Sequence, residues 1–504
     1  MVKARLLLES PFLAGLALGL GLLWVRGFAF VPLALPLGPD WHQYFMAAWK
    51  LSVGVAQDYP AFRMPLYPWV LAALGASGGY AQAAVVISSL SCLVLVVAAA
   101  LLARALAGRW AGALAAVAVA SVTTTLESAR WAAQYPFLAA LTGLGLAAGV
   151  ASVCWPGLGW PLLAGLGAGL CWATDERGIV AAVIAAALVL LGTRRGHRGW
   201  AGPLLFAAGA ASGPLLQRAL EVIPRPRAAW LLQFQRGQTL GDIQGLGMQD
   251  LAPWCGQEWL ALAPLQAAVA PCGRALLWHN LRALGPELPF GLALCALGAL
   301  VALAPGKAGW RGAAASLVLF VGVGVALAAA ASLALLPGRY VLQFAAPAAA
   351  LVPVGLVRIA QTLPRGRLAV PWLMLAGVGW LLTVARPAPP PSRIGPMEAV
   401  QARILAEVRA RVAPDDLLLD CSHNLKVEVA LLPHIHHPEP AAFGEAPDPG
   451  RCQRWARWPD PGEGARWLIT DQDRMLTGVM GRDWRAVAQH EEQGQRGVLW
   501  RGGE

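Results

Sequence analysis

Apolar runs of about 20 residues recur along the first three quarters of the chain, the length that an α-helix needs to cross a bilayer's hydrocarbon core. Of the 504 residues, 57% are hydrophobic and only 13% are charged, which lies outside the usual range of soluble globular proteins. The runs also lack the polar–apolar alternation of transmembrane barrel strands. The sequence therefore predicts an α-helical polytopic membrane protein.

The basic residues between the runs indicate how the chain is oriented. With Lys3 and Arg5 in the cytoplasm, the basic turns near 104–109, 194–198, 307–311 and 358–367 all become cytoplasmic if the chain has about eleven spans. The predicted spans are 11–33, 82–103, 110–125, 134–153, 160–174, 178–192, 200–217, 287–304, 312–335, 341–357 and 369–385. This topology accounts for the net charge of +11, so membrane lipids and not nucleic acid are the expected surroundings.

The same topology predicts the domain organisation and the location. Residues 1–385 form the transmembrane domain, with outer loops near 34–79 and 218–286, and residues 386–504 form an extracytoplasmic domain. The first apolar run is long and has no clear small-x-small cleavage site after it, so we expect an uncleaved span and not a secretory signal. The expected location is the inner (plasma) membrane of a bacterium, with the N-terminus in the cytoplasm.

The tail after residue 386 has the pattern of a small α/β domain. It opens with a stiff proline-rich linker at 387–391. Apolar residues at helical spacing then predict one helix, and three short runs at 417–419, 467–469 and 498–500 predict strands. The apolar positions of the helix are Met397, Val400, Ile404, Leu405, Val408 and Val412.

The cysteines divide by their predicted position. Cys255 and Cys272 share the second outer loop and Cys421 and Cys452 share the tail, so two local disulfides are expected, the alternative being four free thiols. The remaining cysteines lie in or near spans, where cysteine behaves as a small hydrophobe; they are Cys92, Cys154, Cys171 and Cys295.

Several short motifs fall on the predicted outer face. The first outer loop places an acidic residue, Asp40, soon after the first span, and a basic residue, Arg63, before a Pro-Leu-Tyr-Pro run. The motifs read Gly38-Pro39-Asp40-Trp41-His42-Gln43-Tyr44-Phe45, Phe62-Arg63-Met64-Pro65-Leu66-Tyr67-Pro68-Trp69, Thr174-Asp175-Glu176-Arg177-Gly178 and Pro337-Gly338-Arg339-Tyr340. Their order and common sidedness resemble the GT-C glycosyltransferases of the protein O-mannosyltransferase and aminoarabinose-transferase type.

The resemblance implies inverting transfer of a sugar from a polyprenyl-phosphate carrier to a glycan, lipid or protein acceptor on the extracytoplasmic face. Asp40 is then the catalytic base that takes a proton from the attacking hydroxyl or amine. Arg63, Arg177 and Arg339 are expected to stabilise the charge that grows on the leaving phosphate. Many family members carry Asp-Glu where this chain has Asp40-Trp41, which leaves the sugar and the acceptor undetermined.

Further residues complete the predicted substrate site. They are His42, Tyr67, Glu127, Arg130, Asp175, Glu176 and Tyr340. Simpler interpretations stand beside these roles: Asp40 as the N-cap of a helix starting at Trp41, the arginines as ligands of lipid headgroups, and Glu127 with Arg130 as an exposed ion pair.

No nucleotide, redox or zinc motif is present, so the expected donor is the lipid-linked sugar itself, with no cofactor; a metal is not required, although some GT-C relatives use one. The sequence Asp471-Gln472-Asp473 is interpreted as a turn, and the histidines at 423 and 434–437 as solvated. Two other functions remain open: a non-enzymatic assembly or scaffold protein, and a lipid or solute transporter. The Ala, Leu, Gly and Val that fill the span centres count against a transporter, which needs polar or broken helices at mid-membrane.

Overall fold

The computed structural model describes most of the transmembrane domain and the elements of the tail. The described residues are 2–25, 41–52, 64–75, 79–121, 123–129, 133–155, 157–193, 199–220, 228–245, 247–283, 310–335, 342–362, 396–412, 417–420, 465–470, 484–492 and 495–502.

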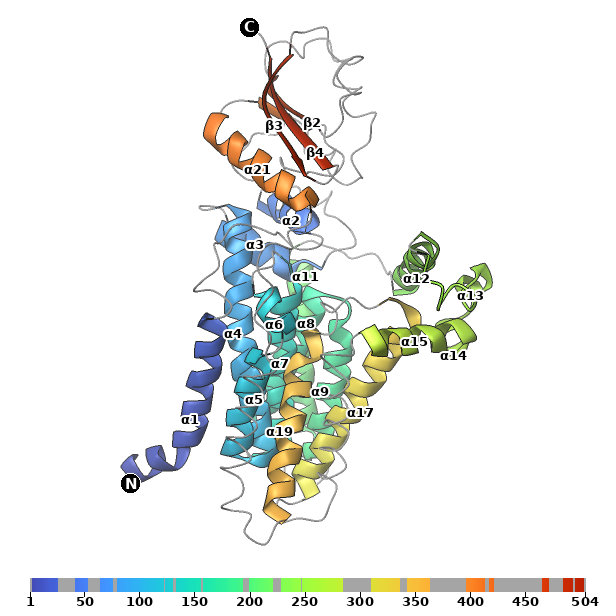
Figure 1. Ribbon diagram of the computed structural model, residues 1–504. Coiled ribbons are helices and arrows are strands. Elements are labelled where there is room, and N and C mark those ends of the chain that lie inside the picture. Colours follow the sequence, from blue (N-terminus) through green and yellow to red (C-terminus); the bar gives the residue numbers. More distant parts are fainter. Residues whose placement is uncertain are drawn as a thin grey trace.

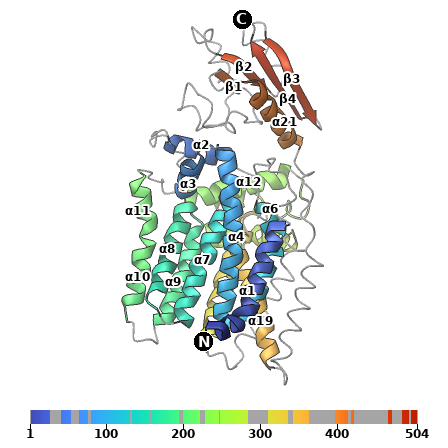
Figure 2. The same ribbon diagram turned by 90° about the vertical axis from the view of Figure 1, so that its left-hand side faces the viewer.

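Helices that are mostly long and apolar pack side by side into a bundle (Figure 1, Figure 2). They are α1 (Val2–Trp24), α4 (Tyr80–Ala107), α5 (Arg109–Ser121), α7 (Tyr135–Cys154), α8 (Gly159–Thr174), α9 (Gly178–Thr193), α10 (Ala201–Ala210), α11 (Ser212–Ala219), α17 (Trp310–Leu333) and α19 (Ala345–Thr362). Small residues allow close backbone approach, as membrane helices require. A Cβ added to Gly15 of α1 would lie 2.4 Å from the Cβ of Ala113 in α5.

Among the described residues, three helical stretches have the length and composition to cross a membrane: Tyr80–Ala107, Tyr135–Cys154 and Arg311–Leu333. Other predicted spans coincide with shorter helices, while 287–304 and 369–385 lie outside the described residues. The count of eleven therefore remains a prediction.

Two predicted spans need correction. The span expected at 110–125 ends at Ser121, because residues from Thr123 form a separate short helix, α6 (Thr123–Ser128). The span expected at 200–217 is interrupted at Ala211, between α10 and α11. Pro214 explains this interruption, since it lacks the N–H that would bond to the carbonyl four residues earlier.

The N-terminus lies at one end of the bundle, and α2 (Trp41–Ser52), α3 (Leu66–Gly75) and the tail domain lie at the other, as both views show (Figure 1, Figure 2). We call this second end the head end; it also carries the turn at 175–177. Helix α2 is held on α4, since the Ser52 and Tyr80 hydroxyl oxygens are 3.1 Å apart.

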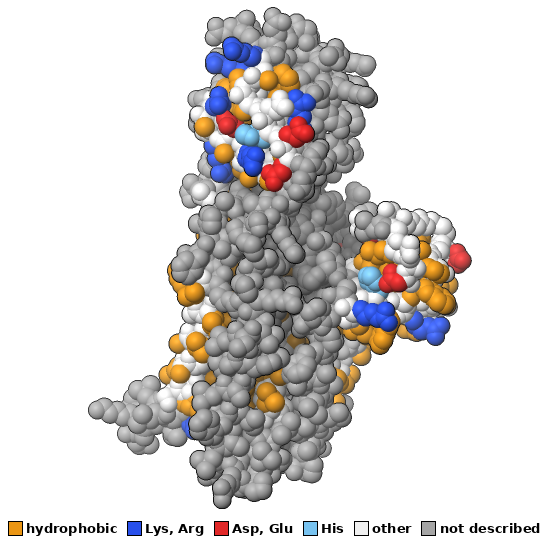
Figure 3. All heavy atoms as spheres, viewed as in Figure 1, with side chains coloured by type: hydrophobic (Ala, Val, Ile, Leu, Met, Phe, Trp, Pro, Cys, Tyr) orange, Lys and Arg blue, Asp and Glu red, His pale blue; other side chains and the backbone are white. Residues whose placement is uncertain are grey.

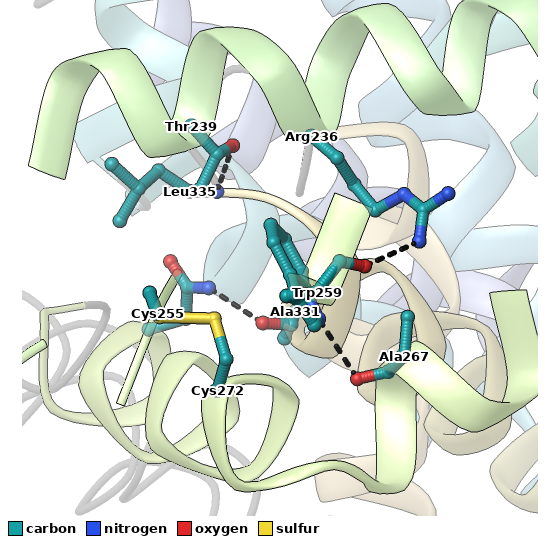
Figure 4. The surroundings of a disulfide bond; sticks show 9 residues. Arg236, Thr239, Cys255, Trp259, Ala267, Cys272, Ala331 and Leu335 are labelled. Atoms are coloured by element: carbon teal, nitrogen blue, oxygen red, sulfur yellow. Dashed lines mark hydrogen bonds between the residues drawn. A yellow bond between two sulfur atoms is a disulfide. The ribbon is translucent and has the colours of Figure 1, made fainter. Parts of the chain in front are cut away.

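A lobe beside the bundle contains α12 (Ala228–Gly245), α13 (Gln257–Ala261), α14 (Pro264–Val269) and α15 (Pro271–Ala283). The predicted Cys255–Cys272 disulfide is present in its core (Figure 4). Arg236 Nη1 donates to the carbonyl oxygens of Trp259 and Leu262 at 3.1 and 2.8 Å, and Trp259 Nε1 donates to the carbonyl oxygen of Ala267 at 3.0 Å. The lobe therefore has a compact interior of its own.

The other cysteines follow the predicted division in part. Cys92, Cys154 and Cys171 are free thiols, and Cys92 and Cys171 are buried. Cys295 and the predicted Cys421–Cys452 pair lie outside the described residues.

The described part of the tail is one helix on a mixed sheet. Helix α21 (Pro396–Arg411) packs on strands β3 (Trp484–Glu492) and β4 (Gln495–Gly502), and its Val400, Ile404 and Val408 are buried. The strand order is β1-β2-β4-β3, with β1 (Leu417–Asp420) parallel to β2 (Ala465–Thr470) and the other pairs antiparallel. Strand β3 was not expected, because it is a polar edge strand without a continuous apolar run.

Candidate functional site

The centre of the candidate site is an ion pair in the turn between α8 and α9. Arg177 Nε donates to Asp175 Oδ1 at 2.7 Å and Arg177 Nη2 donates to Oδ2 at 2.6 Å. The Asp175 side chain is 11% exposed and that of Arg177 is 31% exposed. Parallel, charge-assisted bonds of this kind fix the plane of a guanidinium. Arg177 is therefore held rigidly in a partly buried turn.

The chain around the pair explains why the turn is tight. The Asp175 carboxylate also accepts the backbone N–H of Arg177 at 2.9 Å, which closes the turn. A Cβ on Gly178 would lie 2.3 Å from the carbonyl carbon of Cys171, so only glycine lets α9 start so close to α8.

The first turn of α7 contributes two more groups. Gln134 Nε2 donates to Asp175 Oδ2, and the Arg177 guanidinium carbon lies 5.3 Å from the centroid of the Tyr135 ring, within the range of a cation–π contact. The start of α7 is favoured by Pro136, whose missing N–H costs nothing in the first helical turn. Helix α7 therefore helps to hold both Arg177 and Asp175 in place.

A third segment reaches the turn from much later in the chain. The short helix η3 (Leu342–Phe344) precedes α19, and the side-chain amide of Gln343 donates to the carbonyl oxygen of Arg177 at 3.2 Å. Gln343 follows the predicted Arg339-Tyr340 motif by a few residues.

Aromatic rings connect the first outer loop to the same end. Tyr67 is fully buried in α3, and its ring meets that of Tyr44 of α2 edge-on, with the ring centroids 5.2 Å apart. On its other side it contacts Phe137 of α7, with centroids 6.0 Å apart. The Tyr67 hydroxyl is buried and has no hydrogen-bond partner among the described residues. Such a group is unusual in a folded protein, where buried hydroxyls are bonded.

The remaining predicted site residues are only partly placed. Glu176 lies in the turn beside the ion pair. His42 lies in α2 and Glu127 in α6, but their side chains are outside the described set. Asp40, Arg63, Arg130, Arg339 and Tyr340 lie outside the described residues altogether.

Sequence reasoning missed Gln134, Tyr135 and Gln343, which hold the Asp175–Arg177 pair. Neutral amides carry no strong motif, and these contacts join residues 41 and 166 positions apart. One signal was present: a polar residue directly before an apolar span that opens with Tyr-Pro. Metal-ligand clusters of three or more acidic, histidine or cysteine residues are absent from the part of the chain that is described.

The fold is similar to that of known structures. The oligosaccharyltransferase of Archaeoglobus fulgidus, solved in complex with Zn and sulfate, matches 91% of this chain and 68% of its own length, with a TM-score of 0.50 at 12% sequence identity. The chain has the GT-C fold. The resemblance indicated by the outer-face motifs is thus confirmed at the level of the fold.

Other GT-C structures match with lower TM-scores. ArnT from Cupriavidus metallidurans bound to undecaprenyl phosphate matches over 97% of both chains, with 16% identity and a TM-score of 0.47. The Archaeoglobus fulgidus enzyme AglB, with an inhibitory peptide and a dolichol-phosphate, covers 91% of this chain and 69% of its own, with 11% identity and a TM-score of 0.45. No protein-family model and no curated protein sequence matches the chain.

Proposed function

We propose that the protein is an inverting glycosyltransferase that moves a sugar from a polyprenyl-phosphate carrier to an acceptor on the extracytoplasmic face. The observation that carries the proposal is the meeting of three distant segments around Arg177: the Gln134-Tyr135 start of α7, the turn itself and η3. The turn is one of the motifs that resemble the GT-C transferases, η3 follows another, and the fold is shared with an oligosaccharyltransferase.

In this proposal Arg177 faces the phosphate of the carrier. A guanidinium held in a low-dielectric, partly buried turn stabilises growing negative charge without having to reorganise. Asp175 is a positioning residue, because its two oxygens fix the guanidinium plane. Arg63 and Arg339 with Tyr340 would add further contacts to the phosphate.

Asp40 is the proposed base. It directly precedes α2 in the sequence, and the packing of Tyr44 of α2 on Tyr67 at the head end supports this proposal. The acceptor hydroxyl or amine would lose its proton to Asp40 as it attacks the anomeric carbon. His42, Tyr67, Glu127, Arg130 and Glu176 are the proposed contacts to sugar or acceptor. No metal or cofactor takes part in the proposed reaction.

The charged turns support an outer location of this end. The Arg104 guanidinium carbon lies 4.6 Å from the ring centroid of Phe12 in α1, so the basic turn at 104–109 lies toward the N-terminal end. Basic turns favour the cytoplasm, which supports an extracytoplasmic head end.

The test compares four strains: one lacking the protein, and that strain restored with the wild type, with Asp40→Asn or with Asp242→Asn. Asp242 is an exposed carboxylate in α12 and serves as the matched control. We expect Asp40→Asn to reach the membrane in normal amounts and to lose the same envelope glycan as the deletion strain, while Asp242→Asn restores it. A glycan fully restored by Asp40→Asn would favour the scaffold alternative.

A further inference from the structure

Helix α15 presents a basic and aromatic stripe to its surroundings. Cys272, Leu276 and Asn280 are buried at four-residue spacing, whereas the residues two positions on from each are exposed, and they are Arg274, Trp278 and Arg282. Residues four apart share one face of a helix, so the three form a continuous stripe opposite the buried face. The Trp278 side chain is 58% exposed, and the Arg282 guanidinium carbon lies 5.5 Å from its ring centroid.

The position of α15 relative to the bundle is fixed by hydrogen bonds to the end of α17. Asn280 Nδ2 donates to the carbonyl oxygens of Ala331 and Ala334, at 2.8 Å each. The backbone N–H of Leu335 donates to Thr239 Oγ1 of α12 at 3.2 Å. Because carbonyls at a helix end lack partners within the helix, the lobe satisfies groups that would otherwise be unpaired.

This position places α15 at the level of a membrane surface. Residues Arg311–Leu333 of α17 have the length and composition of a span, so the hydrocarbon core ends where Asn280 binds. Figure 1 shows α15 and α14 extending sideways from that point, away from the bundle. A helix held there meets the headgroup region of the leaflet around the protein.

Neighbouring side chains extend the apolar part of the surface. Leu265 and Val269 of α14 are 79% and 64% exposed, and Trp254 is 58% exposed. Figure 3 shows hydrophobic side chains around the basic ones on this lobe, with the basic ones along its lower margin. Exposed tryptophan with arginine is typical of segments that lie in the membrane–water interface.

We propose that the lobe of α12–α15 is an interfacial anchor for acidic phospholipids of the outer leaflet. Trp278 enters the headgroup region, and Arg274 and Arg282 bind lipid phosphates on either side of it. The occupant is lipid and not a protein partner, because the stripe is attached at the level where a span ends and continues the surface of the bundle. The proposal does not depend on the transferase function.

The experiment uses the full-length protein in lipid nanodiscs. An environment-sensitive fluorescent amino acid is incorporated at position 278, and in a second sample at position 244, where Gln244 is an exposed residue of α12. Lipids with a quencher near the headgroup are then added. We expect about twofold or greater quenching at position 278 and little at position 244. Equal and weak quenching at both positions would overturn the proposal.

A second arm tests the charge. Quenching at position 278 should be stronger in nanodiscs that contain acidic phosphatidylglycerol than in neutral phosphatidylcholine, and Arg274→Gln with Arg282→Gln should abolish this difference. The charge-matched control, Arg403→Gln with Arg411→Gln in exposed positions of α21, should retain it. A lipid dependence that survives the loss of Arg274 and Arg282 would contradict the proposed phosphate contacts.

Discussion

The side-chain amide of Gln343 donates a hydrogen bond of 3.2 Å to the backbone carbonyl oxygen of Arg177, although the two residues are 166 positions apart. This bond attaches the start of α19 to the turn between α8 and α9. The candidate site therefore depends on contacts between segments that are distant in the sequence.

Replacing Asp175 by Asn should reduce transfer without unfolding the protein. The amide retains one acceptor oxygen but presents an N–H₂ to the guanidinium, so Arg177 loses its fixed plane. We expect the KM for the lipid-linked donor to rise and kcat/KM to fall about 10-fold to 100-fold, or about 1.4 to 2.8 kcal/mol.

Initial rates over a range of donor concentrations measure this effect, with thermal unfolding as the check on the fold. Asp242→Asn is the control and Asp175→Glu should recover part of the rate. Unchanged kinetics in Asp175→Asn would remove the pair from the mechanism.

Replacing Tyr67 by Phe should separate function from stability. The Tyr67 hydroxyl is buried without a hydrogen-bond partner in the described chain. Its removal should therefore leave the melting temperature unchanged or raise it, with a gain of up to about 1 kcal/mol in the free energy of unfolding. If the hydroxyl meets substrate, donor or acceptor affinity falls at the same time. A large drop in melting temperature would instead show that the hydroxyl stabilises the fold.

Reducing the Cys255–Cys272 disulfide should loosen the lobe and spare the bundle. The bond closes a loop between residues 17 positions apart, for which the loss of chain constraint is worth about 3 kcal/mol. Limited proteolysis should then cut within 228–283 faster in Cys255→Ser with Cys272→Ser than in the wild type. Cys92→Ser, which changes a free buried thiol, is the comparison, and equal cleavage of all three proteins would contradict the prediction.

The lobe should also respond to acid through Asp250. Asp250 Oδ2 lies 2.9 Å from His279 Nδ1. This hydrogen bond is the main reason that the pKa of Asp250 lies below its ordinary value; the positive charge of His279 adds to the effect and slight desolvation opposes it. The pKa of Asp250 is lower in the folded protein than in the unfolded chain. Asp250 therefore stabilises the folded lobe at a pH above its unfolded pKa of about 4, and this stabilisation is lost as the pH falls through its folded pKa.

Hydrogen exchange of α15 measured at pH 7 and near pH 3 should therefore show faster opening in acid. The effect is small because the Asp250 side chain is 59% exposed. Asp250→Asn should be as labile at pH 7 as the wild type is in acid, and an Asp250→Asn protein that still responds to acid would assign the effect to other carboxylates.

Features set by local pattern were predictable from the sequence. The length of the apolar runs located the helices of the bundle, and helical spacing located α21, whose Val400 and Ile404 are fully buried. The pairing of Cys255 with Cys272 followed from their common loop. These features depend on neighbours in sequence, which is the information that periodicity carries.

Features set by tertiary packing were not predictable in this way. Gln134 and Gln343 carry no charge and lie at helix starts, so only the assembled bundle brings them to Asp175 and Arg177. In the part of the sheet that the structure describes, β3 pairs along one edge, with β4, and this edge position explains its few apolar residues. The break at Ala211 reflects a proline three residues later, within a run that hydropathy alone treats as continuous.

Photocrosslinking of a polyprenyl phosphate to the full-length protein tests the central claim most directly. A carrier with a photoreactive group next to the phosphate is bound in nanodiscs, and the crosslinked peptides are identified by mass spectrometry. The account predicts crosslinks at the head end, in peptides that contain α2–α3, the turn at 175–177 or η3, with competition by unlabelled carrier. Specific crosslinks confined to the opposite end, near the turn at 104–109, would contradict it.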